Sequence, residues 1–209
     1  PILAVYESAE FTNLVAVDKR NGGKGDAQNA GINVSRYPLF CTIDGDSLLE
    51  EDALLRVARP FHDYPGQIVA TGGTIRIANG SLVRAGRITD ARLAHALLPR
   101  IQAVEYLRAF LFGRMGWSSF GGLLLISGAF GIFDKQVVVE AGGYATDSVG
   151  EDMELVIRIH RVLRDRGRSY RIGFVPEPVC WTEAPESLRV LGRQRERWQR
   201  GLIDTLLRH

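Results

Sequence analysis

The sequence is poor in cysteine, nearly neutral in charge, and without a long apolar run. Its two cysteines, Cys41 and Cys180, cannot build a disulfide framework, so we expect both to be small, buried apolar residues of a reduced protein. The net charge of +2 is too small to indicate a nucleic-acid partner. The longest nearly apolar run, residues 121–133, is rich in glycine and shorter than the roughly 18–20 residues that cross a bilayer. The sequence therefore predicts neither nucleic-acid binding nor a transmembrane helix within these residues.

What is present is the composition of a packed domain. With 209 residues, 45% of them hydrophobic and 24% charged, the chain is long enough for one domain over residues 1–209 and short for two. The four histidines lack ligand-like spacing, which argues against a zinc site. The chain begins at Pro1 without a signal peptide, so we expect a fragment or a processed product. Nearly all of the 26 basic residues are arginine, which codon bias and anion binding both explain.

Apolar runs and turn residues alternate along the chain in a pattern that predicts an α/β fold. Residues 39–43 lack polar alternation and are predicted to be a fully buried strand. Strands alternating with helices indicate a layered sheet that binds ligands beyond the carboxyl ends of its strands. The expected strands are 13–17, 39–43, 67–78, 123–133, 170–175 and 179–182; the expected helices are 26–34 (capped by Asp26), 50–61, 99–112, a short one from Asp134 to Gly142-Gly143, 151–163 and 186–209.

Asp44 and Asp46 follow the strand at 39–43, with Gly45 between them. Side chains two residues apart point to the same side of an extended chain, so the two carboxylates can converge on one ligand. Mg²⁺ and Mn²⁺ prefer such oxygen donors and share their remaining positions with substrate phosphates and water. An acidic turn followed by a helix cap is the alternative interpretation.

Glu151 and Asp152 open the helix predicted at 151–163. The helix macrodipole favours acidic residues in a first turn, so helix stabilisation explains this pair as well as catalysis does. A carboxylate at a helix tip is also held rigidly, and it can take a proton from a hydroxyl nucleophile within hydrogen-bond reach.

Gln194, Arg197 and Trp198 are spaced three and four apart and share one face of the last predicted helix. Arginine can hold a diphosphate through two parallel hydrogen bonds, and tryptophan can stack on a sugar ring. An arginine-rich helix that is solvated or lies on a membrane surface is the alternative.

Two glycine-rich stretches offer close approach of the backbone to a ligand. Residues 21–25 contain Lys24 among glycines, which suits a nucleotide phosphate or base, although they match neither the P-loop nor the G-x-G-x-x-G pattern. Residues 127–131, Ser-Gly-Ala-Phe-Gly, indicate either such an approach or tight packing.

Five segments in this order resemble the processive family 2 glycosyltransferases, the group of cellulose, chitin, hyaluronan and poly-N-acetylglucosamine synthases. The resemblance spans about residues 13–202. It implies a GT-A type fold, with a Rossmann-like mixed sheet flanked by helices. It also implies inverting, Mg²⁺- or Mn²⁺-dependent transfer of a sugar from a UDP-sugar to a growing polysaccharide. The matching segments are Asn21–Gly31, Asp44-Gly-Asp46, Ser127–Gly131, Gly150-Glu-Asp152 and the most specific one, Gln194-Arg-Glu-Arg-Trp198.

By this likeness, Asp44 and Asp46 would hold the metal and the diphosphate, and Lys24 would lie beside the nucleotide. Gln194 and Arg197 would sit near the diphosphate. These five residues would form the donor side of the site.

On the acceptor side, Asp152 would be the general base on the acceptor hydroxyl, and Trp198 would form part of the acceptor site. The likeness of residues 127–131 and of Gly142-Gly143-Tyr144 to such synthases favours N-acetylglucosamine as the sugar, with glucose second.

The resemblance further implies segments outside this sequence: a first nucleotide-binding unit before residue 1, and transmembrane helices. We therefore expect an N-terminally truncated catalytic domain of a membrane protein, acting at the cytoplasmic face, with its helix 186–209 at the membrane interface. Two alternatives stay open. One is a non-processive family 2 transferase that adds one sugar to a lipid or protein, and the other is a nucleotide-sugar- or glycan-binding module without catalysis.

Overall fold

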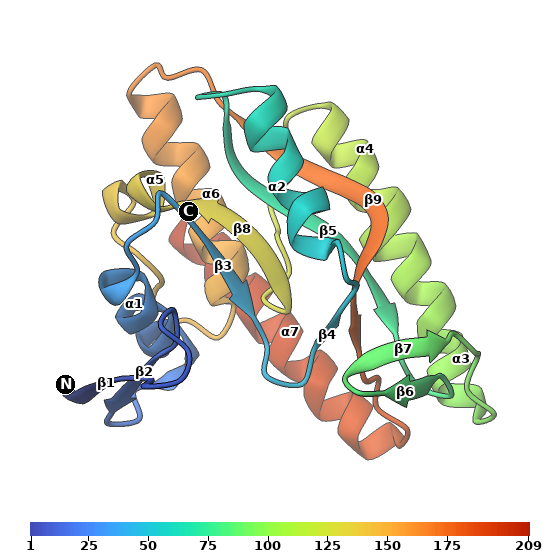
Figure 1. The fold of residues 1–209 in the computed structure, drawn as a ribbon. Coiled ribbons are helices and arrows are strands. Elements are labelled where there is room, and N and C mark those ends of the chain that lie inside the picture. The colour runs from blue at the N-terminus through green and yellow to red at the C-terminus, as the bar shows by residue number, and fades with distance from the viewer.

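A mixed five-stranded sheet lies at the centre of the molecule (Figure 1). Its strands are β3 (Leu39–Ile43), β4 (Leu48–Leu49), β5 (Ile68–Ile77), β8 (Phe130–Asp134) and β9 (Arg171–Thr182). The strand order is β3-β8-β5-β9-β4; β8 runs antiparallel to β3 and β5, and β9 runs parallel to β5. The computed structural model describes the backbone of residues 1–209 and every side chain except those of Pro178 and Val179.

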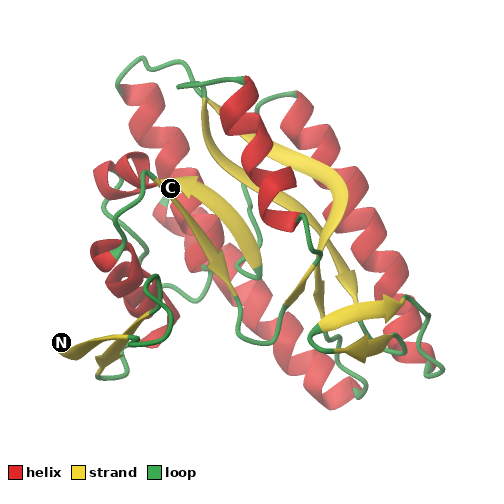
Figure 2. Ribbon diagram, viewed as in Figure 1, coloured by secondary structure: helices red, strands yellow, loops and turns green.

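Two hairpins stand beside this sheet, at opposite ends of the molecule (Figure 2). One pairs β1 (Ile2–Glu7) with β2 (Val15–Lys19), and the other pairs β6 (Leu82–Arg84) with β7 (Arg87–Asp90). The sequence analysis predicted a strand close to β2 and missed β1, β6 and β7.

Helices cover both faces of the sheet. They are α1 (Gly23–Val34), α2 (Ala53–Asp63), α3 (Leu97–Tyr106), the π-helix η1 (Leu107–Gly113), α4 (Arg114–Ser119), α5 (Lys135–Glu140), α6 (Glu151–Asp165) and α7 (Leu188–Arg208). In Figure 1, α2 lies in front of the sheet and α6 and α7 lie behind it. The predicted α/β architecture, a mixed sheet flanked by helices, is therefore confirmed. Within the described part of the chain, no helix is both long enough and apolar enough to cross a bilayer.

The core consists of two buried clusters. In the first, Leu155 and Ile159 of α6 are fully buried against α5 and the sheet, as their spacing of four on one helix face predicts. In the second, Val57 of α2 and Phe130 of β8 are fully buried, and Trp198 of α7 packs at the margin. The second cluster thus joins the sheet to the helix that carries the Gln194–Trp198 segment.

β3 is an edge strand, so the prediction of a fully buried strand was wrong. It pairs with β8 at one end of the sheet, and Ile43 is 47% exposed. The expectation for the cysteines was correct for Cys180, which is buried, and wrong for Cys41, which is exposed on β3. A run of apolar residues cannot distinguish an edge strand from a central one, because apolarity does not report which neighbours the strand acquires.

Two other strands, β8 and β9, have bounds that differ from the prediction. β8 begins at Phe130, and the preceding irregular segment still buries Leu123 and Ile126. The strands predicted at 170–175 and 179–182 form the single strand β9. Its pairing with β5 is irregular around Thr74, whose hydroxyl donates to the carbonyl oxygen of Pro176 at 2.8 Å.

The start of α1 also differs from the prediction. The helix begins at Gly23, with Gly22 at the N-cap, and Asp26 lies inside the first turn without capping it. The Asp26 carboxylate instead pairs with Lys19 at the end of β2. By contrast, Asp134 caps α5 as predicted, because its carboxylate accepts the backbone N–H of Val137 at 3.0 Å.

Candidate active site

A cleft of about 700 Å³ opens beyond the end of β3, between the start of α6 and one face of α7. Four separate parts of the chain bring every residue that the sequence analysis singled out to this cleft. Lys24 comes from the first turn of α1, two acids come from the loop after β3, one acid comes from the start of α6, and three side chains come from α7. The seven residues are Lys24, Asp44, Asp46, Asp152, Gln194, Arg197 and Trp198.

Lys24 lies among the acidic residues of the cleft. Its Nζ is 2.6 Å from Oδ1 of Asp44, 3.6 Å from Oε1 of Glu151, and 3.3 Å from the carbonyl oxygen of Gly128. Burial favours the neutral amine, but the hydrogen bond to Asp44 and the nearby carboxylates outweigh it, so the pKa of Lys24 is raised. Lys24 is therefore a fixed positive charge beside the loop after β3.

Asp152 is held in place by two backbone groups. Its Oδ2 accepts the N–H of Gly128 at 3.0 Å, and its Oδ1 accepts the N–H of Met153 at 2.9 Å. A Cβ at position 128 would stand 2.7 Å from Nζ of Lys24 and 3.4 Å from Oδ2 of Asp152, so glycine leaves room for both side chains beside this backbone. The Ser127–Gly131 segment thus provides close approach of the backbone to the site.

Glu151 precedes Asp152 in the first turn of α6 and is largely buried. Burial, followed by the charge of Asp152, raises the pKa of Glu151 above its ordinary value. The pair therefore places two acids with different environments at one helix tip.

The acidic loop after β3 offers an incomplete set of metal ligands. Among the described residues, no three or more His, Cys, Asp and Glu side chains are arranged to hold a metal ion. Asp44 and Asp46 both line the cleft and supply two carboxylates. This donor set fits a Mg²⁺ or Mn²⁺ ion that takes its other ligands from a substrate phosphate and water, and it does not fit an ion held by protein alone.

The cleft-facing side of α7 carries Gln194, Arg197 and Trp198, as their spacing predicted. The Trp198 ring meets the Phe110 ring edge to face at 6.2 Å, and the guanidinium of Arg195 lies 4.3 Å from the centre of the Trp198 ring. Arg195 itself forms an ion pair with Glu105 of α3 at 2.6 Å. The indole is thereby held between Phe110 of η1 and Arg195 of its own helix. Oε1 of Gln194 has no partner among the described residues.

α7 approaches the start of α6 backbone to backbone. A Cβ on Gly201 would lie 2.9 Å from Cα of Gly150, and a Cβ on Gly150 would lie 3.0 Å from Cα of Gly201. Beside this contact, the hydroxyl of Ser148 donates to Asp204 at 3.0 Å. Two glycines therefore set the distance between the helix tip with Asp152 and the helix with Arg197.

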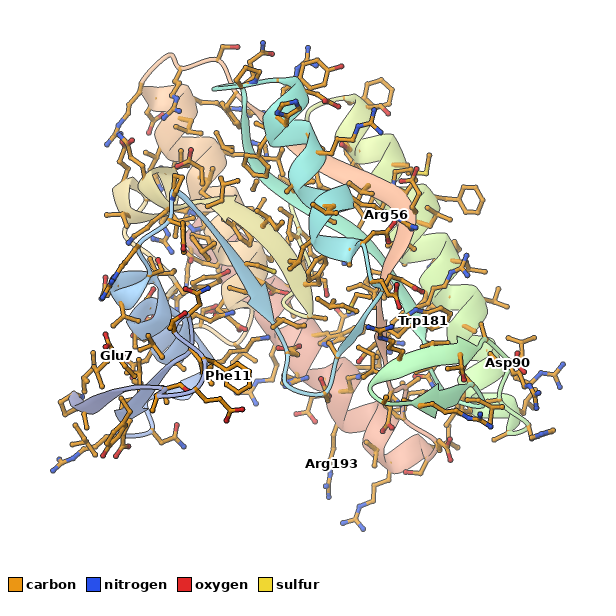
Figure 3. All side chains as sticks on the ribbon, in the orientation of Figure 1. Glu7, Phe11, Arg56, Asp90, Trp181 and Arg193 are labelled. Carbon is orange, nitrogen blue, oxygen red and sulfur yellow. The ribbon has the colours of Figure 1, made fainter. Side chains whose placement is uncertain are left out.

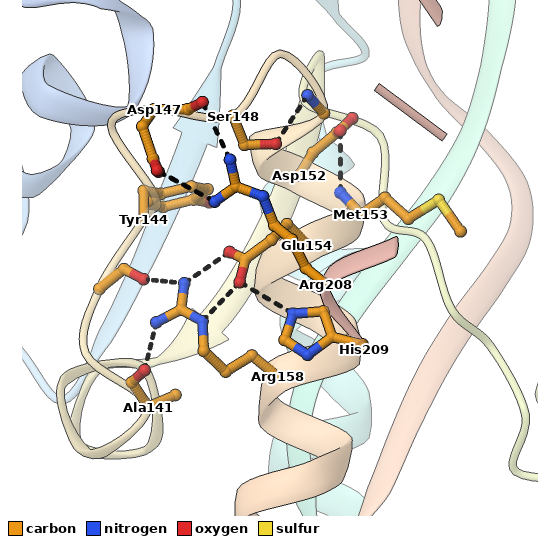
Figure 4. A network of polar contacts seen from close by, with 12 residues as sticks. Ala141, Tyr144, Asp147, Ser148, Asp152, Met153, Glu154, Arg158, Arg208 and His209 are labelled. Atoms are coloured by element: carbon orange, nitrogen blue, oxygen red, sulfur yellow. Dashed lines mark hydrogen bonds and ion pairs between the residues drawn. The ribbon is translucent and has the colours of Figure 1, made fainter. Parts of the chain in front are cut away.

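A polar network secures the same junction (Figure 4). Arg158 of α6 pairs with Glu154 at 2.6 Å and donates to the carbonyl oxygens of Ala141 and Gly143. His209, at the end of the chain, lies 3.2 Å from Oε1 of Glu154. Burial alone would raise the pKa of Glu154, but its partners, Arg158 first among them, lower it. The network ties the loop before Asp152 to the end of α7.

Among the cleft residues that the sequence analysis did not assign, Tyr106, Phe110 and Arg114 form one wall. They recur every fourth residue from Gln102 along α3, η1 and α4, and Phe110 is partly buried while the others are buried. Tyr106 and Phe110 fall one turn apart within the helix predicted at 99–112. The repeat of four, extended to Arg114, was the available signal for this wall of the cleft.

The chain is similar to known proteins over most of its length. Residues 39–209 match the family described as Glycosyl transferase family group 2. The chain is 31% identical over 205 residues to the poly-beta-1,6-N-acetyl-D-glucosamine synthase of Staphylococcus aureus, and 29% identical over 205 residues to that of Staphylococcus epidermidis. Both alignments cover 98% of this chain and 45% of the relative, so the chain spans less than half the length of these curated relatives.

A solved structure supports the fold. A mannosyltransferase from Pyrobaculum calidifontis, in complex with GDP-Man and Mn²⁺, matches with a TM-score of 0.59 at 16% sequence identity. The match covers 91% of this chain and 44% of that one. The predicted GT-A type fold is therefore confirmed.

Proposed function

Because this chain belongs to the Glycosyl transferase family group 2, we propose that it transfers a sugar, with inversion, from a UDP-sugar to a growing polysaccharide. One observation carries this proposal. Acidic residues, a lysine, an arginine and a tryptophan from four separate parts of the chain line a single cleft. A nucleotide sugar needs cations for its diphosphate, a base for the acceptor and an apolar ring for a sugar, and this cleft combines all three.

The donor is proposed to bind on the side of the cleft formed by the loop after β3. Asp44 and Asp46 would hold Mg²⁺ or Mn²⁺ together with the diphosphate. The metal, when bound, neutralises negative charge on the leaving nucleoside diphosphate. Lys24, and Gln194 with Arg197 from α7, would contact the nucleotide and the diphosphate by charge-assisted hydrogen bonds.

Asp152 is proposed to be the general base. The acceptor hydroxyl oxygen attacks the anomeric carbon of the donor sugar, and the hydroxyl proton moves to the Asp152 carboxylate. The bond between the anomeric carbon and the diphosphate oxygen breaks, and UDP leaves. A single displacement of this kind inverts the anomeric configuration. The fixed carboxylate at the tip of α6, held by Gly128 and Met153, supports this role.

Trp198 is proposed to stack against the acceptor sugar, with Phe110 and Tyr106 behind it. The similar staphylococcal proteins are named poly-beta-1,6-N-acetyl-D-glucosamine synthases. Their names support N-acetylglucosamine as the transferred sugar, with glucose as the second candidate.

We also propose that the protein works at the cytoplasmic face of a membrane as a single catalytic domain over residues 1–209. α7 supports this location, because one face lines the cleft while Ile203, Leu206 and Leu207 are 56%, 60% and 84% exposed. Arginines along the same helix suit an anionic membrane surface.

The test is incorporation of sugar by the full-length protein in membrane and soluble cell fractions. Labelled UDP-N-acetylglucosamine, UDP-glucose and other UDP-sugars are supplied with Mg²⁺, Mn²⁺ or a chelator, and product length is measured. We expect a long product from one UDP-sugar and its loss with the chelator.

Asp152→Asn should lower kcat by roughly 10²- to 10⁴-fold with UDP affinity unchanged. Asp165→Asn, exposed at the far end of α6, is the matched control and should leave kcat unchanged.

The outcomes separate the alternatives. If no UDP-sugar is incorporated, the proposed UDP-sugar donor is contradicted. Products one sugar longer than the acceptor indicate the non-processive transferase. Full turnover by Asp152→Asn removes the general-base role. UDP-sugar binding without any wild-type turnover indicates a binding module.

A further inference from the structure

Arg114 is a buried cation that forms no ion pair with the described residues. It is the first residue of α4, lines the cleft and is 6% exposed. Among the groups that the structure describes, none forms a hydrogen bond or ion pair with its guanidinium. The guanidinium carbon lies 4.4 Å from the centre of the Phe110 ring. Burial lowers the pKa of Arg114 to about 10, against the raising effect of the Asp152 charge, so the guanidinium stays charged at neutral pH.

A buried, unpaired charge is costly, and proteins normally pair it or place it where a ligand will pair it. The aromatic contact offsets only part of that cost. The other arginines of α3, η1 and α4 are exposed, so this helical segment turns one arginine inward and the rest outward. The position of Arg114 is therefore not explained by packing alone.

The π-helix explains how the side chain reaches the cleft. Gln102, Tyr106, Phe110 and Arg114 follow one another at intervals of four. In an α-helix of about 3.6 residues per turn, such a repeat drifts steadily around the axis, and after three intervals it points elsewhere. The wider turns of Leu107–Gly113 reverse this drift and return Arg114 to the face of Tyr106 and Phe110. π-helical turns of this kind occur often at functional sites.

We infer that Arg114 binds the diphosphate of the nucleotide-sugar donor, as a second arginine of the cleft besides Arg197; this rests on the proposed function. The diphosphate is the anion that the proposed reaction brings into the cleft. Lys24 is already engaged by Asp44, and Arg197 is solvent-exposed on α7. Arg114 is the cleft cation, among the described residues, that is both buried and unpaired. Its planar guanidinium can donate two parallel hydrogen bonds to phosphate oxygens. Because the group is buried, each of these hydrogen bonds is stronger than the same bond in water.

Binding to the purified full-length protein tests the inference without any turnover. The probes are UDP, inorganic pyrophosphate and uridine, each in Mg²⁺-containing buffer, with Kd measured by calorimetry and Tm measured without ligand. Arg114→Met removes the charge and keeps an unbranched side chain. Arg114→Lys keeps the charge and removes the fork. Arg108→Met, exposed on the same helical segment, is the matched control.

We expect Arg114→Met to lower the affinity for UDP and for pyrophosphate roughly 10- to 100-fold, because one or two charge-assisted hydrogen bonds are lost. Uridine affinity should stay unchanged, and Tm without ligand should equal or exceed that of the wild type, because a buried charge that forms no ion pair is gone. Arg114→Lys should lower the affinity for UDP several-fold. This variant still tests the inference if the methionine variant does not fold. Arg108→Met should bind all three probes like the wild type.

Equal UDP affinity in the wild type, Arg114→Met and Arg114→Lys overturns the inference and leaves the proposed function standing. A lower Tm with unchanged UDP affinity assigns Arg114 to structure, which also overturns it. Arg114-dependent binding of pyrophosphate without binding of UDP supports the inference and contradicts the UDP-sugar donor.

Discussion

Five carboxyl groups face the cleft: Asp44, Asp46, Glu151, Asp152 and Glu183. A dianionic diphosphate could not enter such a field without positive charge nearby, since like charges at close range repel strongly. Lys24 compensates only part of this charge, because its Nζ lies 2.6 Å from Asp44 and 3.6 Å from Glu151. At the scale of single residues, the cleft therefore depends on its arginines and on a divalent ion brought with the substrate.

A substitution at Arg197 tests whether donor binding depends on the arginines of the cleft. Arg197→Gln should lower kcat/KM for the donor roughly 10- to 100-fold, because a charge-assisted contact to the diphosphate is lost. The matched control is Arg193→Gln, one turn earlier on α7, whose side chain points away from the molecule (Figure 3). Equal kinetics in the two variants would show that Arg197 belongs to the solvated side of the helix.

At the scale of elements, α7 is placed by its neighbours more than by its own stability. It has only two buried residues, Gly201 and Thr205, in 21. The Gly150–Gly201 contact, the Ser148–Asp204 hydrogen bond and the Arg208–Asp147 ion pair hold it against the start of α6. The helix is therefore positioned at a few points, and its cleft-facing side chains depend on them.

Gly201→Ala should damage this docking. The new Cβ would lie within 3.0 Å of backbone atoms of Gly150, so the two helices must separate. We expect a loss of about 1–3 kcal/mol in the free energy of unfolding, measured in urea, together with reduced turnover.

Gly192→Ala, on the same helix with open space around its Cβ, is the control. It should stabilise the protein by roughly 0.5–1 kcal/mol, because alanine favours helix over glycine. Stabilisation by both substitutions would contradict a tight helix contact at Gly201.

At the scale of the whole molecule, stability should depend on pH through a buried histidine. His160 of α6 is 5% exposed, with Nε2 2.9 Å from the carbonyl oxygen of Leu123 and Nδ1 2.5 Å from the Tyr170 hydroxyl. The contact with Leu123 joins α6 to the irregular segment before β8. Burial lowers the pKa of His160 below its ordinary value of 6.5, although the Leu123 carbonyl raises it in part.

The sign of the pH effect follows from this shift. Below about pH 6.5 the unfolded chain takes up a proton at His160 that the folded protein does not, so the free energy of unfolding falls as the pH falls. The loss continues until the pH passes the lower folded pKa. His160→Gln should remove this component from urea unfolding measured between pH 7.5 and 5, and exposed His95→Gln is the control for loss of an imidazole. An unchanged pH slope in His160→Gln would contradict the assignment.

Much of the fold was predictable, since local chemistry specifies local structure. The Asp134 cap, the start of α6 at Glu151 and the extended run of β5 all follow from residues close together in the sequence. The prediction failed where a distant partner decides. β3 is an edge strand, and β9 continues through Pro176. Asp26 pairs with Lys19 and does not cap α1.

For the site, the sequence by itself determined which side chains are available and which of them share a face. The spacing of Gln194, Arg197 and Trp198, and of Asp44 and Asp46, correctly predicted that the members of each set lie on one side, and both sets line the cleft. Only the tertiary structure decided that these sets meet in one cleft, that Gly150 and Gly201 fix their separation, and that Arg114 joins them. The physical reason is that spacing constrains directions within one element, whereas distances between elements depend on packing, and Arg114 is turned inward by a π-helix that local propensity did not predict.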